Sequence, residues 1–311
     1  MPDIVFTVFT ATFNRAHTLD RLFASLEAQT FRAFEWVVID DGSTDGTAAK
    51  LADYRSRARF PVTAERQENQ GKHVAHNRAV GLARGELFVI ADSDDELTPD
   101  ALETFHRQWS ALTAEERREF YGVSCHCRDG ATGRVLGRPP ASPVKVPALE
   151  YILREGIDVD LASCARTDVM REHLFPALEG VKLIPEGAVW NRIMRRYRMV
   201  LMDRALEVKH YQADGYTRNL RASYVRHAAG RYWHFLTNLR ENSDLLLRHG
   251  KRRWLKDLIQ LGRMMIHAGK GIGETRRELP GSGSRVVFLL MLPAAWWLAR
   301  GDRSTVLRST V

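Results

Sequence analysis

Strand-like and helix-like segments alternate along the first third of the chain. Short apolar, β-branched runs that suit buried strands occur at 4–11, 34–39, 61–66 and 87–91. Between these runs, apolar residues recur every three or four positions, which is the period of a helix with one buried face. Strands that each cross over through a helix form a mostly parallel sheet with helices on both faces. The pattern therefore predicts an α/β fold for this part of the chain.

Acidic residues follow two of the predicted strands directly. The second strand ends in D-D-G at 40–42, and the fourth runs into D-S-D-D at 92–95. In sheets of this kind, ligands bind beyond the carboxyl ends of the strands. Asp92 and Asp94 are two residues apart on an extended segment, so both carboxylates can converge on a hard cation such as Mg²⁺ or Mn²⁺. A solvated acidic turn before the next helix is the alternative interpretation.

The loop after the first strand argues against a dinucleotide-binding fold. It reads T-A-T-F-N-R-A-H at 10–17 and contains no glycine. The glycine-rich fingerprint that holds a pyrophosphate against a helix N-terminus is therefore missing. If backbone amides do not hold the phosphates of a ligand, a metal ion can do so.

Four motifs, taken in order, resemble those of family 2 glycosyltransferases, which have the GT-A fold. They read V-F-T-A-T-F-N-R at 8–15, V-V-I-D-D-G-S-T-D-G-T at 37–47, N-Q-G-K-H-V-A-H-N-R-A at 69–79 and I-A-D-S-D-D at 90–95. Further matches follow at 184–193 and, more weakly, at 207–219. The resemblance implies a GT-A (Rossmann-like), mostly parallel central sheet flanked by helices. It also implies a nucleoside-diphosphate sugar as the donor.

The resemblance assigns roles to residues on the donor side. The backbone of Ala11 and Thr12 would line the nucleotide pocket, and Asp41 would recognise the base. Lys72 would meet the diphosphate as a point charge, with a solvated lysine at a helix start as the alternative. These residues come from three separate motifs, so the prediction requires the fold to bring them together.

Within the D-S-D-D motif, the resemblance separates the acids by role. Asp94 resembles the direct ligand of Mn²⁺ or Mg²⁺, and Asp92 would contact the metal or the ribose. Ser93 would lie against the nucleotide sugar. Asp95 receives no firm role, and Glu96 is expected to be an exposed acid before the next helix.

A transfer with inversion needs a carboxylate that takes the proton of the acceptor hydroxyl. Glu186 is the candidate, because the family carries an acid facing the acceptor at this position, and here it is followed by glycine. A first-turn glutamate favoured by the helix dipole is the alternative. His210, Tyr211 and Asp214 lie where the family's chain returns towards the active site, and surface roles for them remain equally open.

The rest of the chain is expected to complete this domain and then to extend it. Residues 1–215 are predicted to form the GT-A domain, with 1–110 as the nucleotide-sugar-binding half and 111–215 as the acceptor-side half. Residues 216–311 are predicted to form a helical, basic extension. Between 218 and 263 there are eleven Lys and Arg against three Asp and Glu.

An uncharged segment near the end of the chain suggests contact with a membrane. Residues 286–299 read V-V-F-L-L-M-L-P-A-A-W-W-L-A, and arginines flank them. The segment, which Pro293 interrupts, is shorter than the roughly 20 residues that span a bilayer. A helix in the membrane interface, with Trp296 and Trp297 at headgroup level, fits better, and packing against protein is the alternative.

Composition narrows the compartment and the partners. The formal net charge of +8 favours anionic partners, but no nucleic-acid-binding motif is recognisable, so no nucleic acid is expected. Three cysteines are too few for a disulfide framework, and no signal-peptide pattern opens the chain. We predict a cytoplasmic protein that can associate peripherally with the inner face of the cell membrane.

Together, these features predict a glycosyltransferase that moves a sugar from a nucleoside-diphosphate sugar to a glycan or lipid-linked acceptor. The reaction is predicted to be inverting and metal-dependent, and to serve the synthesis of a surface polysaccharide or glycolipid. The rival hypothesis is a non-catalytic protein on the same fold that binds a nucleotide sugar or a glycan.

Overall fold

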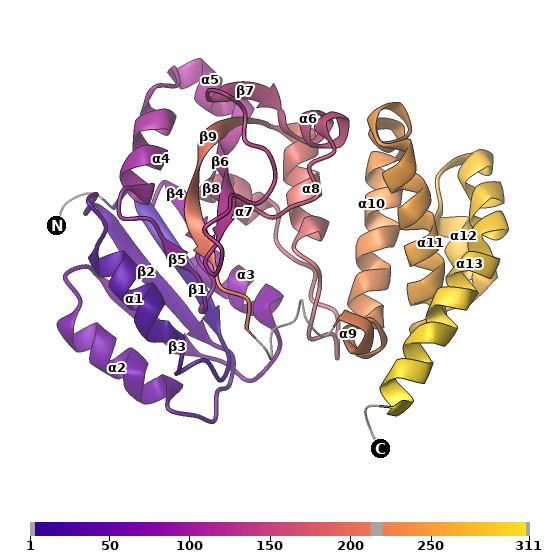
Figure 1. The fold of residues 1–311 in the computed structure, drawn as a ribbon, viewed down its shortest axis with the longest axis horizontal. Helices are drawn as coiled ribbons and strands as arrows, with labels where there is room; N and C mark the ends of the chain where they lie inside the picture. Colours follow the sequence, from indigo (N-terminus) through magenta and orange to yellow (C-terminus); the bar gives the residue numbers. More distant parts are fainter. Residues whose placement is uncertain (1–3, 213–219, 309–311) are drawn as a thin grey trace. The chain divides into compact units, whose positions relative to one another are not determined.

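The computed structural model describes residues 4–212 and 220–308 (Figure 1). Its first half is a parallel sheet with the strand order β3-β2-β1-β4. The strands are β1 (Phe6–Thr12), β2 (Phe34–Asp40), β3 (Val62–Arg66) and β4 (Leu87–Ile90). The helices between them are α1 (Leu19–Glu27), α2 (Thr47–Arg57) and α3 (Lys72–Leu82). The predicted alternation of strands and crossover helices is confirmed.

The sheet continues from β4 into strands of mixed direction. The order is β4-β8-β6-β9-β5, and only β6 and β9 are parallel among these pairs. The additional strands are β5 (Glu96–Leu97), β6 (Phe120–Asp129), β7 (Val144–Pro147), β8 (Leu161–Arg166) and β9 (Arg198–Lys209). The helices of this part are α4 (Ala101–Ser110), α5 (Ala114–Glu119) and α7 (Thr167–Glu172). The nucleotide-side half is thus parallel, whereas the added half is mixed.

Buried aromatic side chains fix the helices against the parallel strands. Trp36 of β2 is fully buried, and its Nε1 donates to Thr10 Oγ1 at 3.0 Å. Phe23 of α1 stacks on Tyr54 of α2, with ring centroids 4.3 Å apart. At the entry to β4, a Cβ on Gly85 would lie 2.5 Å from the backbone of Phe6, so only glycine lets these strands meet there. Packing of this kind holds the strand ends in a fixed register.

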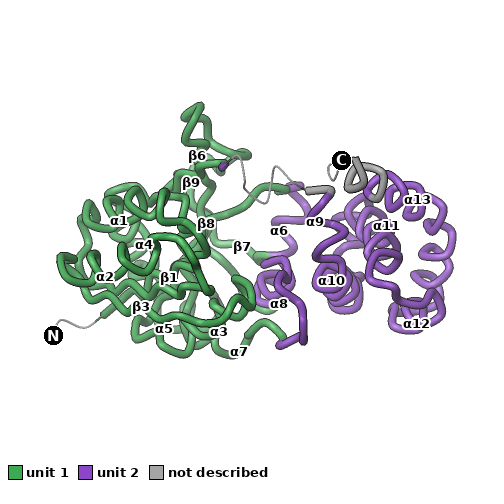
Figure 2. The backbone as a smooth tube through the Cα atoms, turned by 90° about the horizontal axis from the view of Figure 1, so that it is seen from below, with its two compact units in different colours: residues 1–148, 157–176, 196–211 green, residues 149–156, 177–195, 212–311 purple. Residues whose placement is uncertain are grey.

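The chain divides into two compact units (Figure 2). Unit 1 consists of residues 1–148, 157–176 and 196–211, and it contains the whole sheet. Unit 2 consists of residues 149–156, 177–195 and 212–311. Unit 2 therefore includes two segments from within the predicted 1–215 domain. The domain division at residue 215 remains a prediction.

Unit 2 is built from helices. They are α6 (Ala148–Glu155), α8 (Gly187–Arg196), α9 (Leu220–Arg226), α10 (Ala228–His249), α11 (Lys251–His267), α12 (Ile272–Glu278) and α13 (Gly281–Arg308). Its core gathers apolar side chains from α10, α11 and α13, among them Leu239, Leu258, Leu261 and Phe288. The predicted helical extension is confirmed for the described residues.

Helix α13 differs in one respect from the segment expected at 286–299. It continues through Pro293 rather than breaking there, and it runs for 28 residues. A proline inside a helix removes one backbone hydrogen bond, at a cost of about 3 kcal/mol. Burial of Phe288, Ala295 and Ala299 along the whole helix offsets this loss, because each of them is less than 3% exposed.

Candidate active site

The ends of β1, β2 and β4 meet at one edge of the sheet in unit 1. Thr12 pairs with Asp40 across the parallel strands, and the N–H of Asp41 donates to the Thr12 carbonyl at 2.8 Å. Ala11 lies half-buried beside them. The hydroxyl of Thr12 is buried and finds no hydrogen-bond partner within the described part of the chain. The predicted nucleotide-side residues therefore share one edge.

Asp41 fixes the loop that leads into α3. Its carboxylate accepts hydrogen bonds from the N–H groups of Gln70 and Gly71 and from Gln67 Nε2, each at 2.8 Å. Gly71 has a φ of 95°, a conformation that favours glycine. The next residue, Lys72, opens α3. Asp41 thus positions Lys72, and base recognition by Asp41 stays a prediction.

Asp92 lies between two lysines. Lys72 Nζ donates a hydrogen bond to Asp92 Oδ1, and Lys209 Nζ lies 3.4 Å from Asp92 Oδ2. Burial raises the pKa of Asp92, but the two ammonium groups lower it by more, so it lies below its ordinary value. Asp92 is therefore ionised at neutral pH.

Lys209 joins the acidic motif to the far strand of the sheet. It ends β9, which pairs antiparallel with β5 directly after the motif. Its Nζ lies 2.7 Å from Asp95 Oδ2 and 2.6 Å from Glu207 Oε1, the latter as an ion pair without hydrogen-bond geometry. Asp95 also accepts a hydrogen bond from the N–H of His210 at 2.9 Å. One lysine thus contacts three carboxylates, including that of Asp92.

Glu96 does not have the exposed role that was expected for it. It is half-buried at the start of β5, and its Oε1 lies 2.8 Å from His210 Nε2. The expectation was wrong because β9 returns to pair with this short strand, with Glu96 opposite Val208. Tyr211 is exposed, and Asp214 lies outside the described residues.

Burial and charge shift the pKa values of two further carboxylates upwards. Burial raises the pKa of Glu207 to about 7, with Asp95 and Asp92 adding to the rise and Lys209 opposing it. Burial also raises the pKa of Asp94, and the charges of Asp95 and Asp92 raise it further. In both residues burial is the larger cause, and the neighbouring acids add to it.

Asp94 is the acid of the motif that forms no ion pair with the described residues. It is half-buried, and the charge of Arg15 opposes the rise of its pKa only in part. Across the same residues, no group of three His, Cys, Asp or Glu is placed to hold a metal by itself. The roles of Asp94 and Asp92 as metal ligands remain predictions.

Comparison with known proteins identifies the parallel half of unit 1. Residues 7–114 match the family described as glycosyl transferase family 2. This match covers less than half of the 311 residues, and the matched region is called the family 2 domain below. A relative that shares this region is the succinoglycan biosynthesis protein ExoO of Rhizobium meliloti, with 35% identity over 115 residues. The match covers 37% of this chain and 32% of ExoO, so the chain spans about a third of that relative.

Solved structures extend the likeness of the family 2 domain over most of the chain. Staphylococcus aureus TarS aligns with a TM-score of 0.58 at 18% identity, covering 97% of this chain and 55% of TarS. The mannosyltransferase PcManGT from Pyrobaculum calidifontis, solved with GDP-Man and Mn²⁺, aligns with a TM-score of 0.57 at 21% identity. That alignment covers 96% of this chain and 82% of PcManGT. These likenesses concern the fold, and they confirm the predicted GT-A architecture.

The family 2 domain brings several predicted donor-side residues to one edge of the sheet. Lys72 contacts Asp92 there, and Asp41 holds the loop before Lys72. Ser93 is buried next to Asp92, with no role visible in its contacts. Lys209 and Glu207 were not predicted as site residues. A signal was present, because one residue separates them in the extended segment that forms β9, and they therefore share one face of it.

Glu186 lies in unit 2, outside the family 2 match. It is exposed, and its carbonyl accepts hydrogen bonds from the N–H groups of Val189 and Trp190 in the first turn of α8. Packing explains why glycine occupies position 187. A Cβ on Gly187 would lie 3.2 Å from Cε1 of His234 in α10, so any larger residue would press on that ring. The role of Glu186 as a base remains a prediction.

Proposed function

We propose that this protein transfers a sugar from a nucleoside-diphosphate sugar to a glycan or lipid-linked acceptor. The observation that carries the proposal is the cluster of Asp92, Asp94, Lys72 and Lys209 at the strand ends of a family 2 domain. ExoO is named for succinoglycan biosynthesis, and PcManGT was solved with GDP-Man. Synthesis of a surface polysaccharide or glycolipid, at the cytoplasmic face of the cell membrane, is the proposed setting.

The donor would bind along the edge formed by β1, β2 and β4. Asp41 and the backbone of Ala11 and Thr12 would contact the nucleoside, as the family resemblance implies. Lys72 is well placed to meet the diphosphate, because its side chain is partly exposed and its ammonium already lies beside the acidic motif. Ser93 would lie against the nucleotide sugar.

Asp94, with Asp92, would hold Mn²⁺ or Mg²⁺. Two features support this assignment: the raised pKa of Asp94, due first to burial and then to Asp95 and Asp92, and the lack of an ion pair to it from any described residue. When bound, such a cation stabilises the negative charge of a departing diphosphate. Lys209 would keep Asp92 and Asp95 in place on the opposite side of the cluster.

Glu186 would act as the general base of an inverting transfer. Its carboxylate would take the proton of the acceptor hydroxyl while that oxygen bonds to the anomeric carbon and the bond to the diphosphate breaks. Glu186 is exposed and directly precedes α8. Pro185 and Gly187 flank it in the sequence, so it is the acid available at this position of the motif.

A donor panel tests the proposal. The full chain is mixed with UDP-, GDP- and dTDP-sugars, with and without Mn²⁺, and both binding and release of the nucleoside diphosphate are measured. We expect one donor to bind in a metal-dependent way and to be turned over slowly even without an acceptor. Binding of a donor without any turnover, with acceptors added, would favour the non-catalytic hypothesis. Failure to bind any donor would contradict both.

A further inference from the structure

Helix α13 presents an apolar face that the described residues leave exposed. Among the described residues, five of the twelve large apolar side chains that are exposed lie on this one helix. Trp297 is 71% exposed and Leu290 is 66% exposed. The five recur at the spacing of one helical face, so they form a stripe: Val286, Leu289, Leu290, Trp296 and Trp297. An exposed stripe of this length marks an interaction surface.

The opposite face of α13 belongs to the core of unit 2. Phe288 and Ala295 are fully buried, and a Cβ on Gly262 of α11 would lie 2.8 Å from the Cβ of Ala295. Near the end of the helix, Asp302 binds Arg263 of α11 at 2.7 Å. Helix α13 is therefore built into unit 2 on one side, and its stripe remains open on the other.

Helix α13 also has the composition of a membrane-contacting helix. Its stretch Gly281–Asp302 has 22 residues and, by length and composition, is long and apolar enough to cross a membrane. Within the described part of the chain, no second helix meets these criteria. Because one side of the helix is packed in the core, the stripe suits a position in the interface rather than across the bilayer. Two tryptophans in the stripe are typical of that depth.

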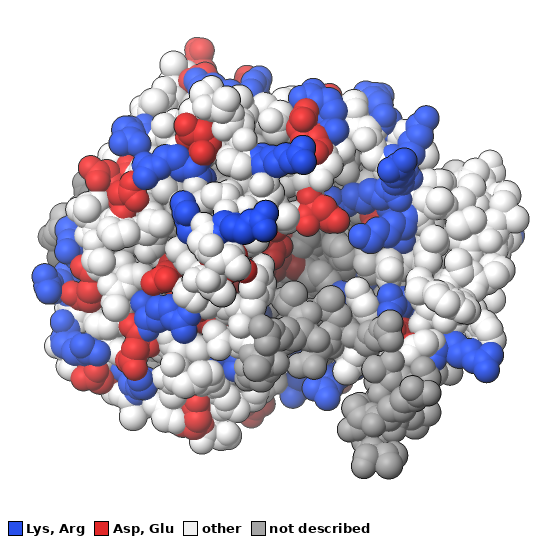
Figure 3. Space-filling model, in the orientation of Figure 1, with Lys and Arg blue, Asp and Glu red and all other residues white. Residues whose placement is uncertain are grey.

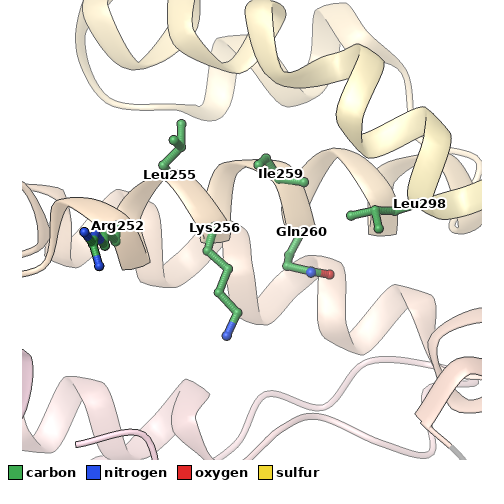
Figure 4. A pocket seen from close by; sticks show the side chains of 6 residues that line it. All are labelled: Arg252, Leu255, Lys256, Ile259, Gln260 and Leu298. Atoms are coloured by element: carbon green, nitrogen blue, oxygen red, sulfur yellow. The ribbon is translucent and has the colours of Figure 1, made fainter. Parts of the chain in front are cut away.

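A groove lies between α11 and α13 (Figure 4). Its volume is about 340 Å³, and it is lined by Arg252, Leu255, Lys256, Ile259 and Gln260 of α11 and by Leu298 of α13. In Figure 4, Leu255 and Ile259 point from α11 towards α13, and Leu298 extends from α13. Lys256 and Gln260 extend to the other side of α11. The groove thus has an apolar wall and a cationic, polar wall.

The charge of this region favours an anionic partner. The first six residues of α11 read K-R-R-W-L-K, and no acidic side chain lines the groove. Figure 3 shows Lys and Arg beside a largely uncharged surface in this part of unit 2. A phosphate near Arg252 and Lys256, with a hydrocarbon chain along Leu255 and Leu298, would match both walls. Phospholipids of an anionic bilayer have this chemistry.

We propose that unit 2 docks on an anionic lipid bilayer through α13 and this groove. The stripe lies in the interface, and the groove seats the phosphate headgroup of a bilayer lipid between Arg252 and Lys256. The headgroup site goes beyond the predicted contact of residues 286–299, because it assigns lipid selectivity to α11. Docking does not depend on the chemistry at the sheet edge, so donor binding serves as an independent measure of an intact protein.

Vesicle binding of the full chain tests the proposal. Vesicles of phosphatidylcholine with phosphatidylglycerol are compared with vesicles of phosphatidylcholine alone, at low and high salt. We expect the first to bind and salt to weaken the binding. The double variant R252A/K256A should bind at least tenfold more weakly, since each cation near an anionic surface contributes about fivefold. Failure of the chain to bind anionic vesicles would overturn the proposal.

Two further variants distinguish lipid binding in the groove from non-specific attraction by charge and from self-association of the chain. R32A/R55A removes the same charge from exposed positions of unit 1, and it should bind like the unchanged chain. Equal losses in R32A/R55A and R252A/K256A would remove the headgroup site. L290S/W297S should lose binding to vesicles without loss of donor binding. If it instead converts a dimer to a monomer while vesicle binding persists, the stripe is an interface between copies of the chain.

Discussion

Two buried charge clusters, one in each unit, differ in how their charges are matched. In unit 2, Asp302 accepts hydrogen bonds from Arg263 and from His267, at 2.7 and 2.9 Å. In unit 1, Lys209 contacts three carboxylates and Lys72 contacts one of the same three. The cluster in unit 2 is complete, whereas the cluster in unit 1 has an excess of negative charge.

The pKa shifts follow the same division. Burial raises the pKa of Asp302, but hydrogen bonds from Arg263 and His267 lower it by more, so it lies below its ordinary value. The pKa of Asp94 is raised, first by burial and then by its acidic neighbours. A matched cluster stabilises the fold, and an unmatched one costs stability and retains affinity for a cation. We therefore predict a structural role for the cluster in unit 2 and a functional role for the cluster in unit 1, and four variants test this difference.

Replacing Lys209 by Met should have the largest effect on stability. Three carboxylates would lose their shared cation. Breaking one buried ion pair lowers the free energy of unfolding by about 3–5 kcal/mol, and we expect a loss at the upper end of this range. The loss should shrink as the pH falls through about 7, where Glu207 takes up its proton, and it should shrink further as Asp95, whose pKa is also raised, becomes protonated. Urea unfolding at several pH values measures both. Lys145→Met, at an exposed pair with Glu116, should cost less than about 1 kcal/mol. A loss independent of pH would show that packing, not charge, is the cause.

Asp302→Ala should destabilise unit 2 without touching the chemistry of unit 1. It leaves the buried guanidinium of Arg263 without a counter-charge, at a cost of about 3–5 kcal/mol. Asp244→Ala, at an exposed pair with Arg195, is the matched control and should cost less than about 1 kcal/mol. Unfolding in urea and donor titration of the folded protein measure the two properties. Lost donor affinity in folded Asp302→Ala would contradict the division into structural and functional clusters.

Asp94→Asn should have the opposite effects to Asp302→Ala: donor binding should be lost, and stability should be retained. Removing a carboxylate whose pKa is raised by burial and by neighbouring acids relieves repulsion, so the thermal midpoint should stay the same or rise. Metal-dependent donor binding should be lost, and transfer should fall by about 100- to 1,000-fold, the usual effect of removing one electrostatic contact to a transition state. Calorimetry with and without Mn²⁺ is the measurement, with Asp53→Asn on the exposed surface of α2 as the control. Unchanged metal dependence would exclude Asp94 as a ligand.

Local patterns predicted the parallel half of the sheet, which contains β1, β2, β3 and β4. The strand-end acids could be read directly, because D-D-G and D-S-D-D follow apolar runs and parallel strands expose their carboxyl ends together. The placement of these acids depends on a few neighbouring residues and on one topological rule. The roles of Asp41 and Lys72 came from the family resemblance instead, and their link is not local, because Asp41 accepts a hydrogen bond from Gly71, 30 positions further along the chain.

Contacts between distant segments were not predictable from such patterns. Lys209 meets Asp95 across 114 positions, through a two-residue strand that has no sequence signature. The same pairing leaves Glu96 half-buried, whereas the sequence suggested that it would be exposed. In α13, the helix continues through Pro293 because its buried face packs on α11, which a local rule for proline does not include. Tertiary packing decided each of these cases.

Glu207→Gln should have the smallest effect of the four variants, and it tests the unmatched cluster most specifically. Because burial raises the pKa of Glu207 to about 7 against an ordinary value of 4.5, the folded chain binds this proton more tightly than the unfolded chain. The resulting stability is fully present below pH 4.5 and is lost as the pH rises to about 7, by about 2–3 kcal/mol. The unfolding free energy of the unchanged chain should therefore fall over this window, in the absence of metal and donor, relative to that of Glu207→Gln.

A spectroscopic signal distinguishes this titration from other carboxylates. Glu207 is 2% exposed, so its protonated form should give an infrared carbonyl band shielded from water that disappears near pH 7 and is missing in Glu207→Gln. A divalent cation at Asp94 and Asp92 should lower the pH at which the band disappears, because added positive charge nearby favours the ionised glutamate. A band that titrates near pH 4.5 would mean that Lys209 already neutralises the cluster, and the contrast with Asp302 would then fail.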